Sequence, residues 1–94
     1  MYYVYVLLSL KYKRLYIGFS NNPFKRRDQH NNGDVPSTKP YRPYKLIYYE
    51  AMLDKKDAMN REVYLKSGWG RRSLKKVIEN YLSEYNLIEF NIIE

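Results

Sequence analysis

Two runs of aromatic and β-branched residues close to the start of the chain constrain its fold more than any other feature. They cover residues 2–8 and 15–19, and only the short polar segment 9–14 separates them. Residues of these types favour strands, and a short polar connection between two strands favours an antiparallel hairpin. The first run is apolar on both faces, so we expect a strand that is buried on both faces.

The alternation of side chains along a strand indicates which residues of this hairpin share a face. It places Tyr16 and Gly18 together on one face of the second strand. If the turn centres near residues 10–11, Tyr5 faces Tyr16 directly across the pair. A glycine weakens a strand interior, so Gly18 indicates a bulge or a place where another backbone or a ligand approaches closely.

The rest of the chain carries signals for helices, loops and one further strand. Asn22 with Pro23 is a typical helix start, and Asp54 followed by Asp57 is another. The predicted elements are helix 23–30, loop 31–43, strand 44–50, helix 55–66, a break at 67–70 and an amphipathic helix from Ser73 to near Asn86. The order β-β-α-β-α-α predicts a small α+β domain whose helices cover an antiparallel sheet.

Length and composition limit the classes of protein that this chain can belong to. Its 94 residues fit a single domain, which we expect over residues 1–86, followed by an acidic, apolar tail at 87–94 that could be a strand or a loose end. With no Cys and one His, the chain has no disulfide scaffold, thiolate nucleophile or His cluster, so any metal must have oxygen ligands. The longest apolar run is too short to span a bilayer and no basic leader precedes it, so we expect a cytoplasmic protein without a membrane partner.

The positive charge of the chain is unevenly distributed. All 17 Lys and Arg residues lie between Lys11 and Lys76, where six acidic residues leave a net charge of +11, and residues 77–94 hold four Glu and no base. A basic body of this kind is typical of a protein that binds a polyanion, most commonly nucleic acid. The alternative is a basic surface that is simply solvated.

Glu62 is the most informative single residue. At helical spacing it shares a stripe with Ala58 and Leu65, so a carboxylate falls on the face that should be buried. A buried carboxylate is unfavourable unless it is paired or bound to a cation. The alternative is a surface Glu that pairs with Lys66 one helical turn later.

The first predicted helix carries the basic cluster Lys25-Arg26-Arg27 directly after the hairpin. Guanidinium groups bind phosphate oxygens and stabilise the charge that develops in phosphoryl transfer, although a solvated helix face is the simpler interpretation. His30 near the end of that helix is favoured there by the helix dipole. Tyr5 and Tyr16, taken alone, are ordinary strand tyrosines that fill a core.

Taken together, these residues resemble the GIY-YIG endonuclease superfamily, and its small stand-alone URI branch in particular. The resemblance rests on Tyr3-Val4-Tyr5, Tyr16-Ile17-Gly18, Ser20, Arg26 ten residues after Tyr16, His30 fourteen after it, the segment 42–50 and Glu62 within the segment 58–66. It covers about residues 2–78. Phe19 stands where several family nucleases carry a Lys, and Asn80 is a candidate for an Asn that some members have.

The resemblance implies a three-stranded antiparallel sheet flanked by helices that acts as a metal-dependent endonuclease on DNA. It assigns catalytic roles to Tyr5, Tyr16, Arg26, His30 and Glu62, and Glu62 is the single ligand of one weakly bound Mg²⁺ or Mn²⁺ ion. Lys25 and Arg27 are expected to contact nucleic acid, and Gly18 to support the site. Either Tyr5 or Tyr16 is expected to orient or deprotonate the attacking water.

Two other functions fit the same sequence. The chain could be a nucleic-acid-binding module without turnover, in which exposed tyrosines on the basic face stack with bases. It could also be a protein-interaction module that uses its acidic tail. As an endonuclease, it could depend on a protein partner for specificity, and DNA repair or recombination would be its setting.

Overall fold

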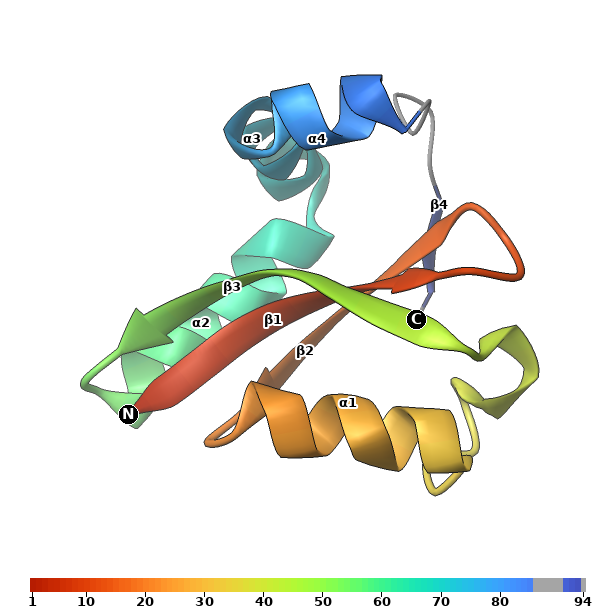
Figure 1. Ribbon diagram of the computed structural model, residues 1–94. Helices are drawn as coiled ribbons and strands as arrows, with labels where there is room; N and C mark the ends of the chain where they lie inside the picture. Colours follow the sequence, from red (N-terminus) through yellow and green to blue (C-terminus); the bar gives the residue numbers. More distant parts are fainter. Residues whose placement is uncertain (86–90, 94) are drawn as a thin grey trace.

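The computed structural model describes residues 1–85 and 91–93, the last three by their backbone. Its elements are β1 (Tyr2–Ser9), β2 (Arg14–Ser20), α1 (Pro23–Asn32), the 3₁₀ turn η1 (Lys39–Tyr41), β3 (Tyr44–Met52), α2 (Lys55–Lys66), α3 (Gly68–Val77), α4 (Glu79–Glu84) and β4 (Asn91–Ile93). The predicted order of strands and helices is therefore confirmed as far as α3, and α4 is an additional helix. The fold is an α+β domain with helices on both faces of one sheet (Figure 1).

The sheet has the strand order β3-β1-β2-β4. The central strand β1 pairs antiparallel with both β2 and β3, which gives the three-stranded antiparallel sheet that the sequence predicted. A fourth strand, β4, pairs parallel with the start of β2, from Arg14 to Tyr16. The expected boundary between the domain and the tail, at residues 86 and 87, lies outside the described residues. Within the expected tail, residues 91–93 form β4.

The observed register of the hairpin differs from the predicted one by two residues. Tyr5 is paired with Gly18, and Tyr16 is paired with Leu7, so the expected direct pairing of Tyr5 with Tyr16 is wrong. The turn centres one residue later than expected, between Lys11 and Tyr12. A shift of the turn centre by one residue changes the residue that is paired with Tyr5 by two positions, from Tyr16 to Gly18. Because side chains alternate with a period of two, Tyr5, Tyr16 and Gly18 keep the predicted shared face.

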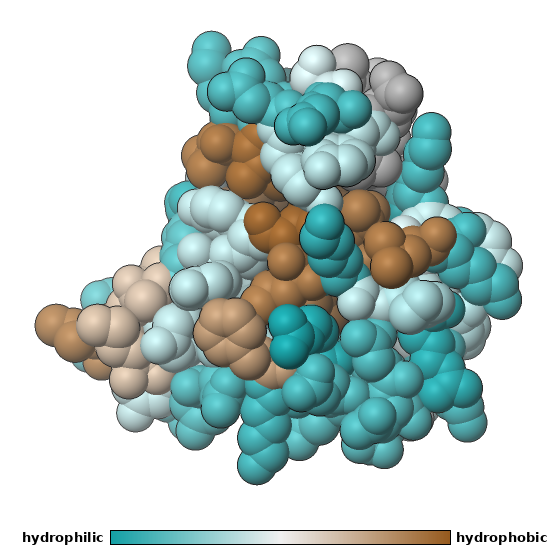
Figure 2. All heavy atoms as spheres, viewed as in Figure 1, coloured by the Kyte–Doolittle hydropathy of each residue, from teal (hydrophilic) through white to brown (hydrophobic). Residues whose placement is uncertain are grey.

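Two cores form on the two faces of the sheet. The larger core lies between the sheet and α2, α3 and α4, and its buried members are Val4, Val6, Leu8, Leu15, Ile17, Ala58, Leu65, Leu74, Ile78 and Leu82. The smaller core, on the face that α1 covers, consists of Tyr5, Leu7 and Tyr44. β1 contributes to both, which confirms the prediction of a strand buried on two faces. The surface over α1, in the lower part of Figure 2, is almost entirely hydrophilic.

The C-terminal helices differ from the single helix expected from Ser73. Ser67 caps a helix that already begins at Gly68, because its hydroxyl accepts a hydrogen bond from the Gly70 N–H at 3.1 Å. A Cβ at Gly70 would collide with the backbone of α2 at Tyr64, so this glycine allows α3 to begin against the end of α2. The helical run is interrupted at Ile78, where α3 ends and α4 follows.

The caps of the first two helices follow the sequence closely. The Asn22 side chain accepts a hydrogen bond from the Lys25 N–H, and Asp54 accepts from the Lys56 and Asp57 N–H groups. α1 continues two residues beyond the predicted end, to Asn32, and is followed by the C-cap Gly33 at φ 82°. This left-handed conformation favours glycine and ends the helix. No helix within residues 1–85 is long and apolar enough to cross a membrane.

Candidate active site

The face of the sheet beneath α1 brings Tyr5, Tyr16 and Gly18 together. A Cβ at Gly18 would overlap the ring and hydroxyl of Tyr5, its partner across the strand pair, and would crowd the ring of Tyr16. The group that approaches this glycine closely is therefore an aromatic side chain, whereas the sequence predicted a bulge, a backbone or a ligand. Without a side chain at position 18, the Tyr5 ring can lie flat across β2 and extend its hydroxyl toward α1.

The Tyr5 hydroxyl is hydrogen-bonded to His30. The Tyr5 hydroxyl and His30 Nε2 are 2.9 Å apart, and His30 Nδ1 lies 2.7 Å from Thr38 Oγ1, with both His30 and Thr38 fully buried. The Thr38 hydroxyl donates to the Val35 carbonyl at 3.2 Å, so it accepts from a proton on His30 Nδ1. His30 Nε2 is then unprotonated and accepts from Tyr5.

Burial keeps both members of this pair neutral. Desolvation raises the pKa of Tyr5 well above its usual value, and the neighbouring Tyr16 adds to the rise, while the Arg26 guanidinium opposes it. Desolvation and the charge of Arg26 lower the pKa of His30 from 6.5 to about 4. At neutral pH, Tyr5 is a phenol that donates to a neutral imidazole.

Tyr16 occupies a different environment from Tyr5, although it lies beside it. Its ring centroid is 4.8 Å from that of His30 and 6.2 Å from that of Tyr5, and its side chain is partly exposed. Of the two tyrosines assigned to the site, Tyr16 is the one that a substrate or water can reach from solvent.

Arg26 approaches the same cluster from α1. Its Nη1 donates to Gln29 Oε1 at 2.9 Å, and its charge lowers the pKa values of both Tyr5 and His30. It also lines a hollow of about 370 Å³ at the end of β2, together with Tyr2, Phe19, Ser20, Asn21, Gln29 and Lys55. Phe19 stacks on Tyr2 at this hollow, with ring centroids 6.2 Å apart.

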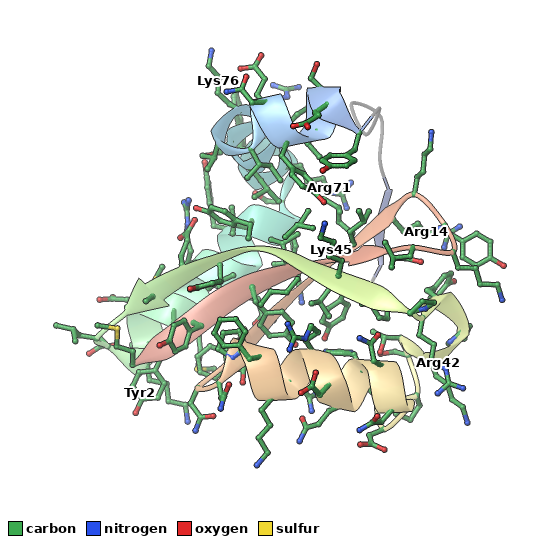
Figure 3. All side chains as sticks on the ribbon, viewed as in Figure 1. Tyr2, Arg14, Arg42, Lys45, Arg71 and Lys76 are labelled. Atoms are coloured by element: carbon green, nitrogen blue, oxygen red, sulfur yellow. The ribbon has the colours of Figure 1, made fainter. Side chains whose placement is uncertain are left out.

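The other two cations of the predicted cluster have different surroundings. Lys25 is exposed on α1. Arg27 is turned toward its neighbours, with its Nε 3.1 Å from the Asp28 carboxylate and its guanidinium over the Phe24 ring. Neither takes part in the contacts of Tyr5 and His30, so a role for Lys25 and Arg27 toward nucleic acid stays a prediction. Basic side chains also come from other elements: Arg14, Arg42, Lys45, Arg71 and Lys76 are labelled in Figure 3.

Glu62 lies on α2 between Ala58 and Leu65, which are fully buried as predicted. Its side chain is 23% exposed, and its Oε2 is 3.3 Å from Lys66 Nζ. The carboxylate is therefore both partly buried and paired with Lys66, which combines the two alternatives drawn from the sequence. Its charge raises the pKa of Tyr5, so Glu62 acts on the same cluster as Arg26 but from a different helix.

Glu62 fits a single hard cation better than a multi-ligand metal centre. The described residues contain no group of three metal-ligating side chains, and Oε1 of Glu62 has no hydrogen bond to any of them. A lone carboxylate oxygen suits an ion such as Mg²⁺, which keeps several of its waters.

An ion pair that the sequence did not indicate anchors α2 to the sheet. Arg61 Nε and Nη2 donate to the two carboxylate oxygens of Glu50 on β3 at 2.8 and 3.0 Å, and the Tyr48 hydroxyl donates to Glu50 Oε2 at 2.8 Å. Thr38 and Gln29 were also missed. No signal in the sequence singles them out, because Thr38 lies in a loop and Gln29 among polar residues of a helix.

The fold and this cluster define a small α+β domain that carries a buried Tyr–His pair between its sheet and α1. The chain matches the GIY-YIG catalytic domain over residues 1–86 and belongs to that family. The resemblance noted in the sequence is thereby confirmed.

Several relatives are UPF0213 proteins from bacteria. One from Clostridium perfringens is 38% identical over 94 residues, which cover 93% of this chain and 100% of the relative. One from Pediococcus pentosaceus is 34% identical over 87 residues, covering 92% and 90%. One from Bacillus licheniformis is 38% identical over 79 residues, covering 83% and 79%. No solved structure matches the chain.

Proposed function

We propose that this protein is a metal-dependent endonuclease that hydrolyses phosphodiester bonds in DNA. The observation that carries the proposal is the convergence of opposite charges on one tyrosine–histidine pair. Arg26 from α1 and Glu62 from α2 both act on Tyr5, which is hydrogen-bonded to His30. A cation and a carboxylate beside tyrosines suit the chemistry of a phosphate diester, and membership of the GIY-YIG catalytic domain family supports this assignment.

Glu62 would hold one Mg²⁺ or Mn²⁺ ion through its carboxylate. When bound, such an ion polarises a phosphoryl oxygen and lowers the pKa of bound water. The ion would compete with Lys66 for the carboxylate, and the substrate phosphate would add a further oxygen ligand to the ion, so we expect weak binding of the ion without substrate.

Arg26 would bind the scissile phosphate and neutralise the charge that develops on it. Its position favours this role, because it lines the hollow at the end of β2 while its charge acts on Tyr5. Its hydrogen bond to Gln29 restricts the guanidinium, so that little ordering of the side chain is needed when a phosphate binds.

The two tyrosines would have separate tasks. Tyr5 is buried, donates a hydrogen bond to His30 and has a raised pKa, so its task would be to hold His30 and the neighbouring Tyr16 ring in position rather than to act on the water. Tyr16 is more accessible and is the better candidate for the group that contacts the attacking water, whose proton it could take up only as a phenolate. His30, held by Thr38, would keep the Tyr5 hydroxyl in place.

Replacing two neighbouring cations of α1 by Ala, one at a time, tests this proposal. With DNA at saturating concentration and Mg²⁺ present, Arg26→Ala is expected to lower the single-turnover cleavage rate by about 100- to 1,000-fold, the cost of losing one preorganised charge. Lys25→Ala is the matched control, because it removes the same charge from the same helix at an exposed position. Single-stranded, duplex, flap and branched DNA should all be assayed.

The control variant is expected to weaken DNA binding while leaving the saturated rate within about twofold, since an exposed cation acts through binding alone. Equal loss in both variants would mean that α1 contributes only a general positive surface. That result, or binding without any cleavage by the wild type, would favour the nucleic-acid-binding module over the enzyme.

A further inference from the structure

A second basic surface lies on α3, on the other side of the sheet from α1 (Figure 1). This helix carries Arg71, Arg72, Lys75 and Lys76 and no acidic residue. Trp69 in its first turn is 74% exposed, and the Arg72 guanidinium lies over the Trp69 ring at 5.1 Å from its centroid. Trp69 thus presents a large exposed aromatic ring beside several cations, which is the combination that stacks with bases.

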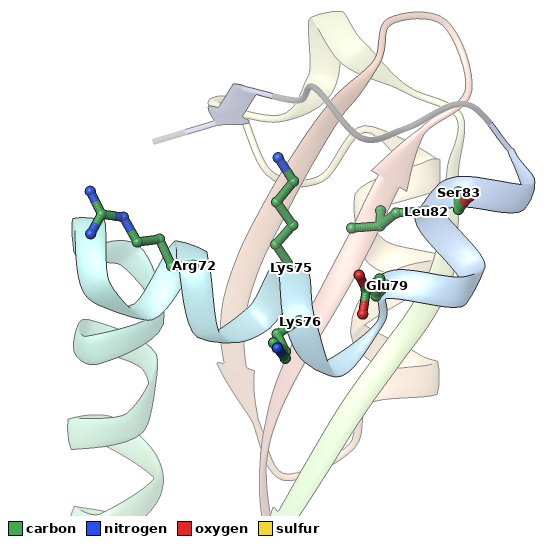
Figure 4. Close-up of a pocket in the computed structure, with 6 residues that line it drawn as sticks. All are labelled: Arg72, Lys75, Lys76, Glu79, Leu82 and Ser83. Carbon is green, nitrogen blue, oxygen red and sulfur yellow. The ribbon is translucent and has the colours of Figure 1, made fainter.

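A hollow of about 320 Å³ adjoins this pair where α3 meets α4 (Figure 4). Its lining residues are Arg72, Lys75, Lys76, Glu79, Leu82 and Ser83. Lys75 and Lys76 form no ion pair with any residue in the described part of the chain, and Lys75 is partly buried. Three cations around a hollow with one carboxylate, Glu79, leave a local excess of positive charge.

We propose that α3 binds a single-stranded segment of nucleic acid. A base stacks on the exposed face of Trp69, and the backbone phosphates that follow lie against Lys75 and Lys76 at the hollow. Stacking on an aromatic ring combined with a basic track for the backbone is the general mode of binding single strands without sequence preference. Arg72 over the indole adds a planar cation to the stack.

This inference rests on the proposed function and makes it more specific. α3 and α1 lie on opposite sides of the sheet. A nucleotide that is bound to α3 therefore cannot also lie in the hollow that Arg26 lines. The preferred substrate is therefore a nucleic acid in which a single-stranded arm adjoins the segment that is cleaved.

An anionic membrane surface is the other polyanion that a basic helix with a Trp can contact. A helix that lies on a membrane must bury an apolar face in it. In α3 the positions that face the core, Gly70 and Leu74, are already buried within the protein. The arrangement therefore favours nucleic acid over lipid.

Trp69 is the single tryptophan of the chain, so tryptophan fluorescence reports on α3 alone. The first measurement is the fluorescence of Trp69 in the Glu62→Gln chain with EDTA, titrated with an oligothymidylate of about 16 nucleotides, a length that covers known single-strand sites. We expect saturable quenching that weakens as salt rises. The wild-type chain in EDTA should respond in the same way. Both conditions exclude cleavage, so a failure of the proposed nuclease activity would leave this result unaffected.

Variants then locate the binding surface through the anisotropy of a labelled oligothymidylate. Trp69→Ala is expected to weaken binding about tenfold or more, as loss of one stacking partner does, and Trp69→Phe to restore part of it. The matched control is Tyr12→Ala, an exposed aromatic residue of the hairpin that also lies beside a cation, Lys11.

Charge variants test the phosphate contacts. Replacing both Lys75 and Lys76 by Gln should lower the salt slope of log affinity by about 1.4, and the pair Lys11→Gln with Lys13→Gln should lower it less. The proposal is overturned by binding that leaves Trp69 fluorescence unchanged, by equal effects of the α3 and hairpin variants, or by quenching with phosphatidylserine vesicles but not with the oligonucleotide.

Discussion

At the scale of single residues, the two tyrosines of the candidate site differ in their surroundings rather than in their chemistry. Tyr5 is 1% exposed and its hydroxyl is 2.9 Å from His30 Nε2, whereas Tyr16 is partly exposed and contacts His30 with its ring. The sequence could place both on one face but could not separate their roles. That separation depends on Thr38, which fixes the His30 tautomer and lies in a loop without a recognisable signal.

Removing each hydroxyl in turn should give opposite results. Tyr5→Phe leaves His30 Nε2 buried without a donor, so we expect it to lower the free energy of unfolding by about 1–3 kcal/mol. Tyr16→Phe should change stability by less than about 0.5 kcal/mol, because its hydroxyl has no hydrogen-bond partner among the described residues, but it should lower the rate of DNA cleavage more than Tyr5→Phe does. Urea unfolding and single-turnover cleavage measure the two effects. Equal destabilisation by both variants would contradict the assignment.

The buried His30 makes stability depend on pH. Its pKa falls from 6.5 in the unfolded chain to about 4 in the folded one, so between these values only the unfolded chain takes up the proton. Stability is therefore complete above pH 6.5 and decreases as the pH falls toward 4. At roughly 1.4 kcal/mol per pKa unit, the loss reaches at most about 3 kcal/mol.

Urea unfolding at about pH 7 and about pH 4.5 measures this loss in the wild type and in His30→Gln, in which the side chain at position 30 no longer titrates. The carboxylates titrate alike in both proteins, so the difference between the two pH dependences isolates His30. If the variant shows the same dependence as the wild type, His30 is not the buried neutral group described above.

At the scale of secondary-structure elements, the position of α2 decides where Glu62 lies. The residue before it in the chain, Arg61, binds Glu50 of β3 through two hydrogen bonds, and this contact fixes both the height and the rotation of the helix on the sheet. Arg61 thus stabilises the orientation in which Glu62 acts on Tyr5.

A double-mutant cycle on this pair tests its strength. For Glu50→Gln and Arg61→Gln, with side chains only 18% and 30% exposed, we expect a coupling free energy of about 1–3 kcal/mol in urea unfolding. The exposed pair Arg27 and Asp28 is the control and should give less than about 1 kcal/mol. Similar coupling in the two cycles would mean that the Arg61 contact does not anchor α2.

Most elements could be predicted because their signals are local, and the errors arose where the deciding contacts are distant. The Asn22 and Asp54 caps and the faces of the first two strands depend on neighbouring residues, and these predictions are confirmed. The hairpin register was wrong because its loop lacks a turn sequence that fixes the centre. The early start of α3 was missed because Gly70 was interpreted as a helix breaker, whereas its role is to allow close contact with α2.

At the scale of the whole molecule, the sheet separates two basic surfaces. α1, with Arg26, covers the face of Tyr5 and Tyr16, and α3 lies on the other side with Trp69 (Figure 1). The longest dimension of the described chain is 34 Å, about one turn of a DNA duplex. The net charge of +7 predicted a polyanion partner, but only the structure distributes that charge over two faces.

A comparison of Glu62→Gln with the wild type, for both cleavage and binding of the same DNA, decides whether this carboxylate holds an ion that the reaction needs. With Mg²⁺ present, the account predicts a loss of cleavage of at least about 100-fold, because the variant lacks the ligand for the ion. Affinity for DNA in EDTA should stay within about twofold of the wild type, and Glu84→Gln, an exposed carboxylate variant, should retain both properties. Equal cleavage by Glu62→Gln and the wild type would contradict the account.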